Sequence, residues 1–327
     1  KTFFESIGAK IVLSHPNNKS IVDKGVKLAI DDLCLPFKAY FGHVTELLNN
    51  TEIDFLFIPR MISLGQKNHV CPKFMGLPDM IKASFDQLPP IIEPEIDLRK
   101  KIFPVRRIFY YIGNKLGINW LKIEKAFRKA RKKQSRFEKI LKKGYTPLEG
   151  MQILEGEREL EKTDLKDIRS KSENEGLRVA VLGHSYLIND SHLSMGLIEH
   201  LRGLGVEVIT HEMIDKSDRE QASEIQYKKS YWFYNRQIMG AAYHLLNKVK
   251  DRIDGIIQVT SFGCGPDSLI KELVSLKVKN NKDEFLLNLD IDEHSGEAGL
   301  ITRLEAFTDL LRRRRKTYEK NNLSASG

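Results

Sequence analysis

Residues 177–186 read Leu-Arg-Val-Ala-Val-Leu-Gly-His-Ser-Tyr, which is a short apolar run followed by a glycine and then by polar side chains. An apolar run that ends at a glycine is typical of a buried strand in a parallel sheet. A helical pattern follows around Leu193–Leu204, and a second apolar run follows at Val206–Thr210. Strand, helix and strand in this order predict a parallel α/β unit.

The same alternation continues on both sides of this stretch. Towards the C-terminus we expect strands at Gly255–Val259 and Phe285–Leu289. In the N-terminal part we expect strands at Lys10–Leu13, Asp54–Ile58 and Pro90–Ile92, and helices at Asn18–Ala29, Phe37–Leu48 and Pro78–Phe85. The predicted fold class is therefore α/β, with two Rossmann-like parallel-sheet lobes. Neither the G-x-G-x-x-G fingerprint nor a P-loop occurs, so the familiar kinds of nucleotide binding are not supported.

Length and composition set the domain organisation. The chain has 327 residues, of which 41% are hydrophobic, which suits a folded protein of two lobes. We predict a first α/β lobe at residues 1–98, a basic helical insertion with a linker helix at 99–175, and a second α/β lobe with a C-terminal helix at 176–327. The linker helix is expected at Pro147–Lys171. Because Lys1–Gly8 already reads as the end of a helix, we expect the opening strand of the first lobe to lie before residue 1.

Positive charge is concentrated in the insertion. Between Arg99 and Lys143 there are 17 Lys and Arg residues against two acidic ones, a net +15, so the rest of the chain carries −6 of the overall +9. Apolar residues recur there at helical spacing, which predicts helices with one buried stripe. Three interpretations of this basic segment remain open: a solvated helical face, a docking surface for an acidic protein, or a surface that contacts phosphates. No recognition motif supports nucleic acid.

Three features bear on where the protein acts. No stretch approaches the ~18 consecutive apolar residues of a membrane span, and we see no signal peptide at the start. Three cysteines are too few for a disulfide framework, and their odd number would leave one of them unpaired. We therefore expect a cytoplasmic protein with reduced thiols.

All three cysteines stand beside proline or glycine in predicted loops. Cys34 precedes Leu35-Pro36, Cys71 precedes Pro72, and Cys264 lies in Gly263-Cys-Gly-Pro266. Parallel sheets bind ligands outside the carboxyl ends of their strands, where such loops meet. Three thiolates with an open fourth position suit an iron–sulfur cluster. The alternatives are three unrelated buried cysteines, or a Cys3His zinc site. The fourth zinc ligand would then be His15, His43, His69 or His294.

Several segments around these cysteines are similar to one known family. They are Asp32-Leu-Cys-Leu-Pro-Phe-Lys-Ala-Tyr-Phe-Gly-His43, Cys71-Pro-Lys-Phe-Met-Gly-Leu-Pro-Asp79, Gly183-His-Ser-Tyr186 with Asp190, Phe262-Gly-Cys-Gly-Pro-Asp-Ser268, and Leu289-Asp-Ile-Asp-Glu-His-Ser-Gly-Glu-Ala-Gly299 continuing into Thr302-Arg-Leu-Glu-Ala-Phe307. The chain resembles the activase-related proteins of the 2-hydroxyacyl-CoA dehydratase and benzoyl-CoA reductase superfamily, in the version that lacks the ATP-binding activase domains. It departs from that pattern at Ser185, where a proline is usual.

The resemblance implies two flavodoxin-like lobes with a helical insertion and a 4Fe–4S cluster in the cleft between the lobes. Cys34, Cys71 and Cys264 would be the cluster ligands. It further implies low-potential electron transfer from an ATP-driven activase or another redox protein, and radical dehydration or reduction of an acyl-CoA-like substrate in an anaerobic type of metabolism. The chain would then be a lyase or reductase component. Two alternative functions remain open: a non-catalytic electron carrier or assembly partner, and a zinc-stabilised α/β binding module. Assembly as a dimer also remains open.

Other polar residues near the cysteines are candidates for the surroundings of a cluster or for substrate contacts. Positively charged neighbours would offset the negative charge of a thiolate-ligated cluster. Polar residues after the strand at Leu177–Leu182 would hydrogen-bond the cluster or a substrate, or else satisfy the backbone of their own loop. The residues in question are Lys38, Arg60, Lys73, His184, Tyr186, Asp190 and Ser268.

Overall fold

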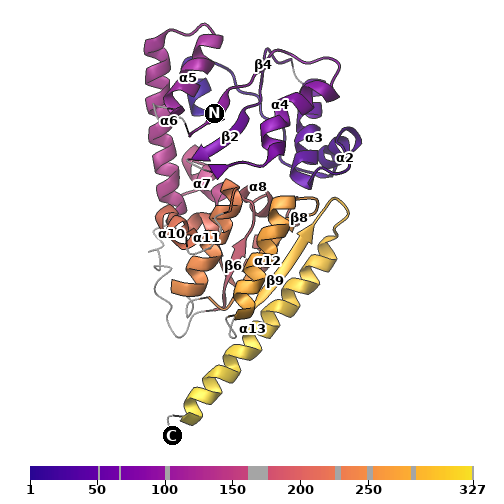
Figure 1. The fold of residues 1–327 in the computed structure, drawn as a ribbon, viewed down its shortest axis with the longest axis vertical. Helices are drawn as coiled ribbons and strands as arrows, with labels where there is room; N and C mark the ends of the chain where they lie inside the picture. The colour runs from indigo at the N-terminus through magenta and orange to yellow at the C-terminus, as the bar shows by residue number, and fades with distance from the viewer. Residues whose placement is uncertain are drawn as a thin grey trace. The chain divides into compact units, whose positions relative to one another are not determined.

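The computed structural model describes residues 1–50, 52–65, 68–99, 104–160, 176–224, 230–248, 253–280 and 285–325. The chain divides into two compact units. The first comprises Lys1–Leu33, Phe37–Ile140 and Lys228–Arg236, and the second comprises Cys34–Pro36, Leu141–Tyr227 and Gln237–Gly327. The predicted α/β class with parallel sheets is confirmed (Figure 1). The three-part division at residues 98 and 175 stays a prediction.

The second unit is built on a four-stranded parallel sheet. Its strands are β6 (Arg178–Leu182), β7 (Glu207–Thr210), β8 (Gly255–Ser261) and β9 (Leu286–Ile291), in the order β7-β6-β8-β9. Every residue of β6 and β8 is buried, as expected for central strands that are covered on both faces. The sequence predicted all four strands within two residues of their bounds.

Helices cover this sheet. They are α7 (Pro147–Glu155), α8 (Ser185–Ile188), α9 (Leu197–Gly203), α10 (Lys216–Ser223), α11 (Phe233–Lys248), α12 (Gly265–Asn280) and α13 (Glu297–Ala325), with a 3₁₀ turn η1 at His211–Met213. One core joins Ala180 and Leu182 of β6 to side chains of α11 and α12. Because side chains alternate along a strand, the buried Val179 and Val181 lie on the opposite face.

The first unit contains shorter strands. β1 (Leu56–Phe57) pairs in parallel with β4 (Ile91–Ile92), and β2 (Arg60–Gly65) pairs in parallel with β5 (Glu95–Asp97) and antiparallel with β3 (Asn68–His69). The helices are α1 (Thr2–Ile7), α2 (Lys19–Leu28), α3 (Leu35–Asn50), α4 (Pro72–Ser84), α5 (Pro104–Lys115) and α6 (Trp120–Leu141). A Cβ at Gly25 would lie 1.8 Å from the Lys38 carbonyl oxygen, so glycine lets α2 and α3 approach closely.

Two expectations for the first lobe are wrong. No strand forms at Lys10–Leu13 within the described residues, and Leu13 is 71% exposed, so the segment buries little of the apolar surface that a strand needs. The stretch between the predicted strand Asp54–Ile58 and the predicted helix Pro78–Phe85, for which no element was expected, contains β2 and β3. Accordingly α4 begins at Pro72 and contains Pro78, because Pro72 takes the N-terminal position that proline favours.

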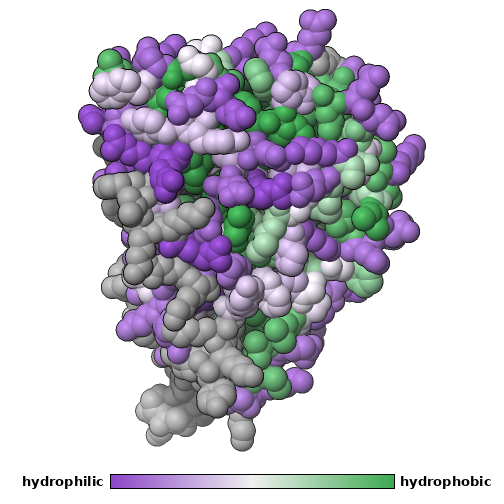
Figure 2. All heavy atoms as spheres, turned by 45° about the horizontal axis from the view of Figure 1, so that its top comes forward, coloured by the Kyte–Doolittle hydropathy of each residue, from purple (hydrophilic) through white to green (hydrophobic). Residues whose placement is uncertain are grey.

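The basic insertion is helical, as predicted. Ile123 and Ala126 of α6 pack with Ile112 of α5 and with Phe3 and Ile7 of α1. Apolar side chains such as Trp120 and Leu121, each 63% exposed, also reach the surface. Over the face in Figure 2, hydrophobic groups lie among long hydrophilic side chains.

The linker helix was predicted at Pro147–Lys171. Helix α7 covers its first part, and residues 161–171 lie outside the described residues. In the part of the chain that the structure describes, no helix is both long and apolar enough to cross a bilayer.

Candidate functional site

The order of strands fixes where a ligand site is expected in the second unit. The chain passes from β6 to β7 on one side, then crosses back to β8 and on to β9 on the other. β6 and β8 are hydrogen-bonded neighbours, so the winding reverses between them (Figure 1). Ligands of open α/β sheets bind at the carboxyl ends of the strands at such a switch point.

Glycine allows the loop after β6 to run against β8. A Cβ at Gly183 would lie 2.6 Å from Ile188 Cγ2 and 2.7 Å from the Val259 carbonyl oxygen. Only a residue without a side chain fits this approach. His184, the next residue, is thereby placed at the switch point as the N-cap of α8.

Three side chains converge at this point. The donor atoms of His184, Cys264 and Asp267 all lie within 4.8 Å of one another. His184 Nε2 is 3.0 Å from Asp267 Oδ1, and these two residues are only 5% and 2% exposed. The His184 ring also stacks on Tyr186 with centroids 4.8 Å apart, which fixes its orientation. The group offers one thiol, one imidazole and one carboxylate to a cation.

The loop after β8 presents the cysteine. The Cys264 N–H donates to the Ser261 carbonyl at 3.0 Å, and Gly263 adopts a positive φ of 75° in this turn. The Ser268 hydroxyl donates to the Cys264 carbonyl at 3.0 Å, so Ser268 holds the backbone of this turn. The thiol is left partly buried at the start of α12.

Cys34 belongs to the same unit as Cys264. Cys34 is 4% exposed, and the N–H of its neighbour Leu35 donates to Ser261 Oγ at 3.2 Å. The charge of Cys34 acts on the Cys264 thiol, so the two sulfurs lie close enough to interact electrostatically. Cys34 and Cys264 therefore lie near the same loop after β8, and their role as cluster ligands stays a prediction.

Burial and nearby negative charge act together on the Cys264 thiol. Burial raises the pKa of the Cys264 thiol, and the Asp267 charge and Cys34 raise it further, against a hydrogen bond from the Asp267 N–H. A high pKa leaves the sulfur protonated and a poor nucleophile. A cation at the sulfur reverses this balance because it stabilises the thiolate.

A family model matches residues 1–214, which is most of the chain. Its description is CoA enzyme activase uncharacterised domain (DUF2229). The chain belongs to this family. The matched region contains Cys34, Cys71 and His184 and ends shortly after β7. The comparison with curated proteins gave no match.

Cys71, the third predicted ligand of this activase-associated protein, lies in the first unit. It is the N-cap of α4, and its carbonyl accepts a hydrogen bond from the Phe74 N–H at 3.0 Å. Burial raises the pKa of Tyr234 to about 12, with a smaller contribution from the Cys71 charge, so this phenol lies near the thiol. The convergence of Cys71 with Cys34 and Cys264 stays a prediction.

The predicted positive residues have partners within the first unit. Arg60 makes two hydrogen bonds to the Asp79 carboxylate, at 2.6 and 2.7 Å, and Lys73 Nζ donates to the Asp32 carbonyl at 3.0 Å. Lys38 is buried in α3. In the second unit, the Asp190 carboxylate accepts hydrogen bonds from backbone N–H groups of its own loop. Their proposed roles beside a cluster stay predictions.

Three of the four histidines considered for zinc have partners within the first unit. His15 Nδ1 is 2.6 Å from Glu46 Oε1, and His43 Nε2 is 2.9 Å from Asn17 Oδ1. The His69 ring stacks on Tyr231 at 4.6 Å. Among the described residues, the histidine grouped with Cys264 is His184, which the sequence suggested only as a hydrogen-bonding residue.

Sequence reasoning missed Asp267. It is the third residue after Cys264 and follows Gly265-Pro266, so it falls in the first turn of α12 and its N–H meets the sulfur. The signal was present, because Gly-Pro after a strand marks a helix start and an acid in the first turn suits the helix dipole.

Proposed function

We propose that this protein binds a 4Fe–4S cluster through Cys34, Cys71 and Cys264 and works with an ATP-driven activase in low-potential electron transfer to an acyl-CoA-like substrate. The reaction class that we propose is radical dehydration or reduction. The observation that supports the proposal is the hydrogen bond from the Leu35 N–H to Ser261 Oγ, which ties the segment of Cys34 to the loop that carries Cys264. Membership of the CoA enzyme activase-associated family supports the link to an activase.

The residues present fit such a group. Thiolates are the ligands that iron–sulfur clusters use, and the Asp267 N–H already hydrogen-bonds the Cys264 sulfur, as backbone donors do around clusters. A bound cluster with one iron position open supplies one-electron transfer and Lewis-acid activation of a carbonyl. The proposal requires Cys71 of the first unit to reach the same place.

The chain's own residues would orient the site. Tyr186 stacks on His184, and Asp267 holds the Nε2 edge of the same ring, so the imidazole has a fixed direction beside the thiol. The Ser261 hydroxyl accepts a hydrogen bond from the Leu35 N–H, and the Ser261 carbonyl accepts one from the Cys264 N–H. Together these bonds tie the Cys34 segment to the loop after β8. Near-complete burial of His184 and Asp267 keeps bulk water from this wall of the site.

We further propose that the exposed basic faces of α5 and α6 receive an acidic partner surface, and that the protein acts in the cytoplasm. The net +15 between Arg99 and Lys143 supports the first point, since complementary charge accelerates association. Three reduced thiols support the second.

Iron and acid-labile sulfide, measured after anaerobic isolation, test the proposal. We expect about four of each per chain in the wild type. Cys264→Ala should lose the cluster, while Glu272→Ala, an exposed position about two turns further along α12, should keep it. Circular dichroism checks that both variants are folded. A full complement of iron in folded Cys264→Ala protein would remove this residue from the site.

A catalyst and an electron carrier differ in their response to substrate. If the protein is the catalyst, acyl-CoA thioesters should perturb the EPR signal of the reduced cluster. If no thioester changes the signal, the carrier is favoured over the catalyst.

The 4.8 Å grouping of His184, Cys264 and Asp267 favours zinc as a second candidate. Such a site would take a cysteine, a histidine and a carboxylate, all of which bind zinc. One equivalent of zinc without iron or sulfide, lost in His184→Ala, would establish this candidate. Retention of iron in His184→Ala would support the cluster.

A further inference from the structure

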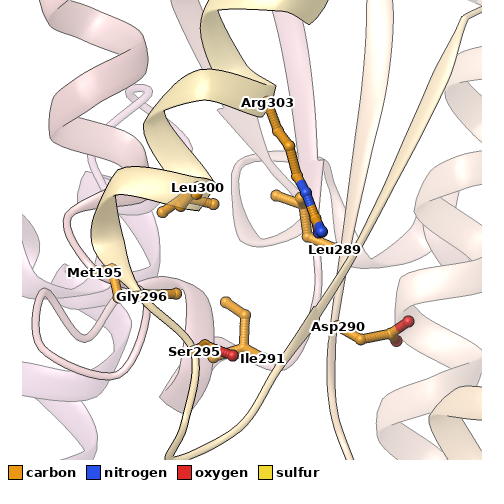
Figure 3. A pocket seen from close by; sticks show the side chains of 9 residues that line it. Met195, Leu289, Asp290, Ile291, Ser295, Gly296, Leu300 and Arg303 are labelled. Atoms are coloured by element: carbon orange, nitrogen blue, oxygen red, sulfur yellow. The ribbon is translucent and has the colours of Figure 1, made fainter.

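A hollow opens beside the carboxyl end of β9 in the second unit. Its volume is about 170 Å³, smaller than the roughly 300–1,000 Å³ of sites for drug-sized ligands, so it suits one end of a small molecule. It is lined by Met195, Leu289, Asp290, Ile291, Ser295, Gly296, Gly299, Leu300 and Arg303 (Figure 3). Like Cys264, the hollow lies at the edge where parallel sheets bind ligands.

Arg303 is the positively charged residue that lines the hollow. Its side chain extends from α13 towards Leu289 (Figure 3). Among the residues that the structure describes, it has no hydrogen-bond or ion-pair partner at contact distance. Asp290, which also lines the hollow, binds Lys271 Nζ at 2.9 and 3.0 Å, and among the smaller effects on its carboxyl the Arg303 charge lowers the pKa.

The other polar groups of the hollow are already engaged. The Ser295 hydroxyl donates to Asp292 Oδ1 at 2.8 Å and accepts from the Asp292 N–H at 3.0 Å. Glu297, in the first turn of α13, lies 3.1 Å from His200 Nε2. Arg303 is therefore the group left to recognise a ligand, and a guanidinium selects an oxyanion.

The remaining walls are apolar and leave space. Leu289, Ile291 and Leu300 form the inner surface together with Met195. A Cβ built at Gly296 or Gly299 would meet no heavy atom within 4 Å, so packing does not require glycine at either position. Glycine inside a helix costs about 1 kcal/mol relative to alanine. At Gly299 it keeps the hollow open.

Backbone strain occurs at the same place. Met195 has a positive φ of 53°, a conformation that is unfavourable for a residue with a side chain. Such strain collects at ligand-binding positions, where the surrounding structure maintains it.

We propose that this hollow binds a short-chain organic oxyanion, with the carboxylate or phosphate on Arg303 and the apolar chain against Leu289, Ile291 and Leu300. The site is next to the candidate metal centre in the sheet, because Ile291 pairs with Ser261, three residues before Cys264. The proposal does not depend on the identity of the metal or cluster.

Calorimetric titration with four probes tests the site: butanoate, butyl phosphate, inorganic phosphate and the neutral butanol. We expect saturable binding of butanoate or butyl phosphate below about 10 mM. The tighter of the two identifies the anion. Inorganic phosphate and butanol should bind at least about tenfold more weakly, because each lacks one half of the interaction. Binding of inorganic phosphate as tight as that of butyl phosphate would overturn the apolar part of the proposal.

Two variants distinguish this site from nonspecific charge. Arg303→Gln should weaken binding about tenfold or more, whereas Arg313→Gln, which removes an exposed cation ten residues further along α13, should not. Gly299→Leu keeps Arg303 but fills the hollow, so binding should be lost while the melting temperature is kept or raised. Absence of saturable binding in the wild type, or unchanged affinity in Arg303→Gln, would overturn the proposal.

Discussion

Replacing Gly183 by alanine tests the close approach that places His184 at the switch point. The added Cβ would lie 2.6 Å from Ile188 Cγ2 and 2.7 Å from the Val259 carbonyl oxygen. Nonbonded atoms normally stay about 3.5 Å or more apart, so something must move by nearly 1 Å. The Val259 carbonyl belongs to a central strand and cannot rotate away. We expect a loss of about 2–3 kcal/mol, the upper part of the range for overpacked cores.

Hydrogen exchange of peptides from β6 and β8 measures this loss directly. Tryptophan fluorescence is less suitable because Trp120 and Trp232 both lie in the first unit. A loss of 2–3 kcal/mol corresponds to a fall in protection of about 30- to 150-fold. Gly203→Ala is the matched control, since a Cβ there meets nothing within 4 Å and alanine favours the helix. If Gly183→Ala exchanges no faster than wild type, the loop does not approach β8 as described.

Three further changes test single interactions. Glu149→Gln should destabilise the protein by about 2–3 kcal/mol at neutral pH: burial alone would raise the pKa of Glu149, but hydrogen bonds from Arg202 and Thr146 lower it from 4.5 to about 2. That stabilisation is present above about pH 4.5 and is lost as the pH falls towards 2, so the urea midpoints of variant and wild type should converge there. Burial and then the Asp267 charge raise the pKa of the Cys264 thiol, so Asp267→Asn should lower this pKa. In chelator-treated protein near pH 8, the variant's Cys264 should therefore react faster with iodoacetamide than that of the wild type. An unchanged alkylation rate, measured by mass spectrometry, would contradict this. Reversing several charges in residues 128–133 should weaken activase binding at low salt without lowering the melting temperature, and unchanged affinity would favour a solvated helical face.

The central strands of the second unit were predictable because their residues carry the whole signal. Val179, Ala180 and Val181 are apolar in succession and buried on both faces, which only a central parallel strand explains well. The apolar run at Lys10–Leu13 looked similar, but strand formation also needs a neighbour for its backbone, and the sequence does not reveal whether one is present. The start of α4 was misplaced because Pro72 and Pro78 both satisfy the rule for a first helical turn.

The sequence predicts the position of the site only through the rule that ligands of parallel sheets bind outside the carboxyl ends of the strands. That rule places His184 after β6 and Cys264 after β8, and the order β7-β6-β8-β9 makes these strands neighbours. The contact between His184 and Asp267 depends on how α12 leaves its loop, which the spacing of residues does not specify. The hollow at Arg303 was missed for the same reason, because its walls come from three separate segments.

Asp267 is the residue on which the two metal hypotheses differ physically. Three thiolates already give a cluster site a net negative charge, and a buried carboxylate beside them would stabilise the oxidised cluster and lower its reduction potential. That direction suits an electron donor of low potential that needs an ATP-driven partner for its own reduction. A zinc ion would instead take the same carboxylate and the His184 imidazole as ligands and neutralise both the acid and the thiolate. The contact between His184 Nε2 and Asp267 Oδ1 would therefore persist beside a cluster. With zinc bound, bonds from both side chains to the metal would replace it.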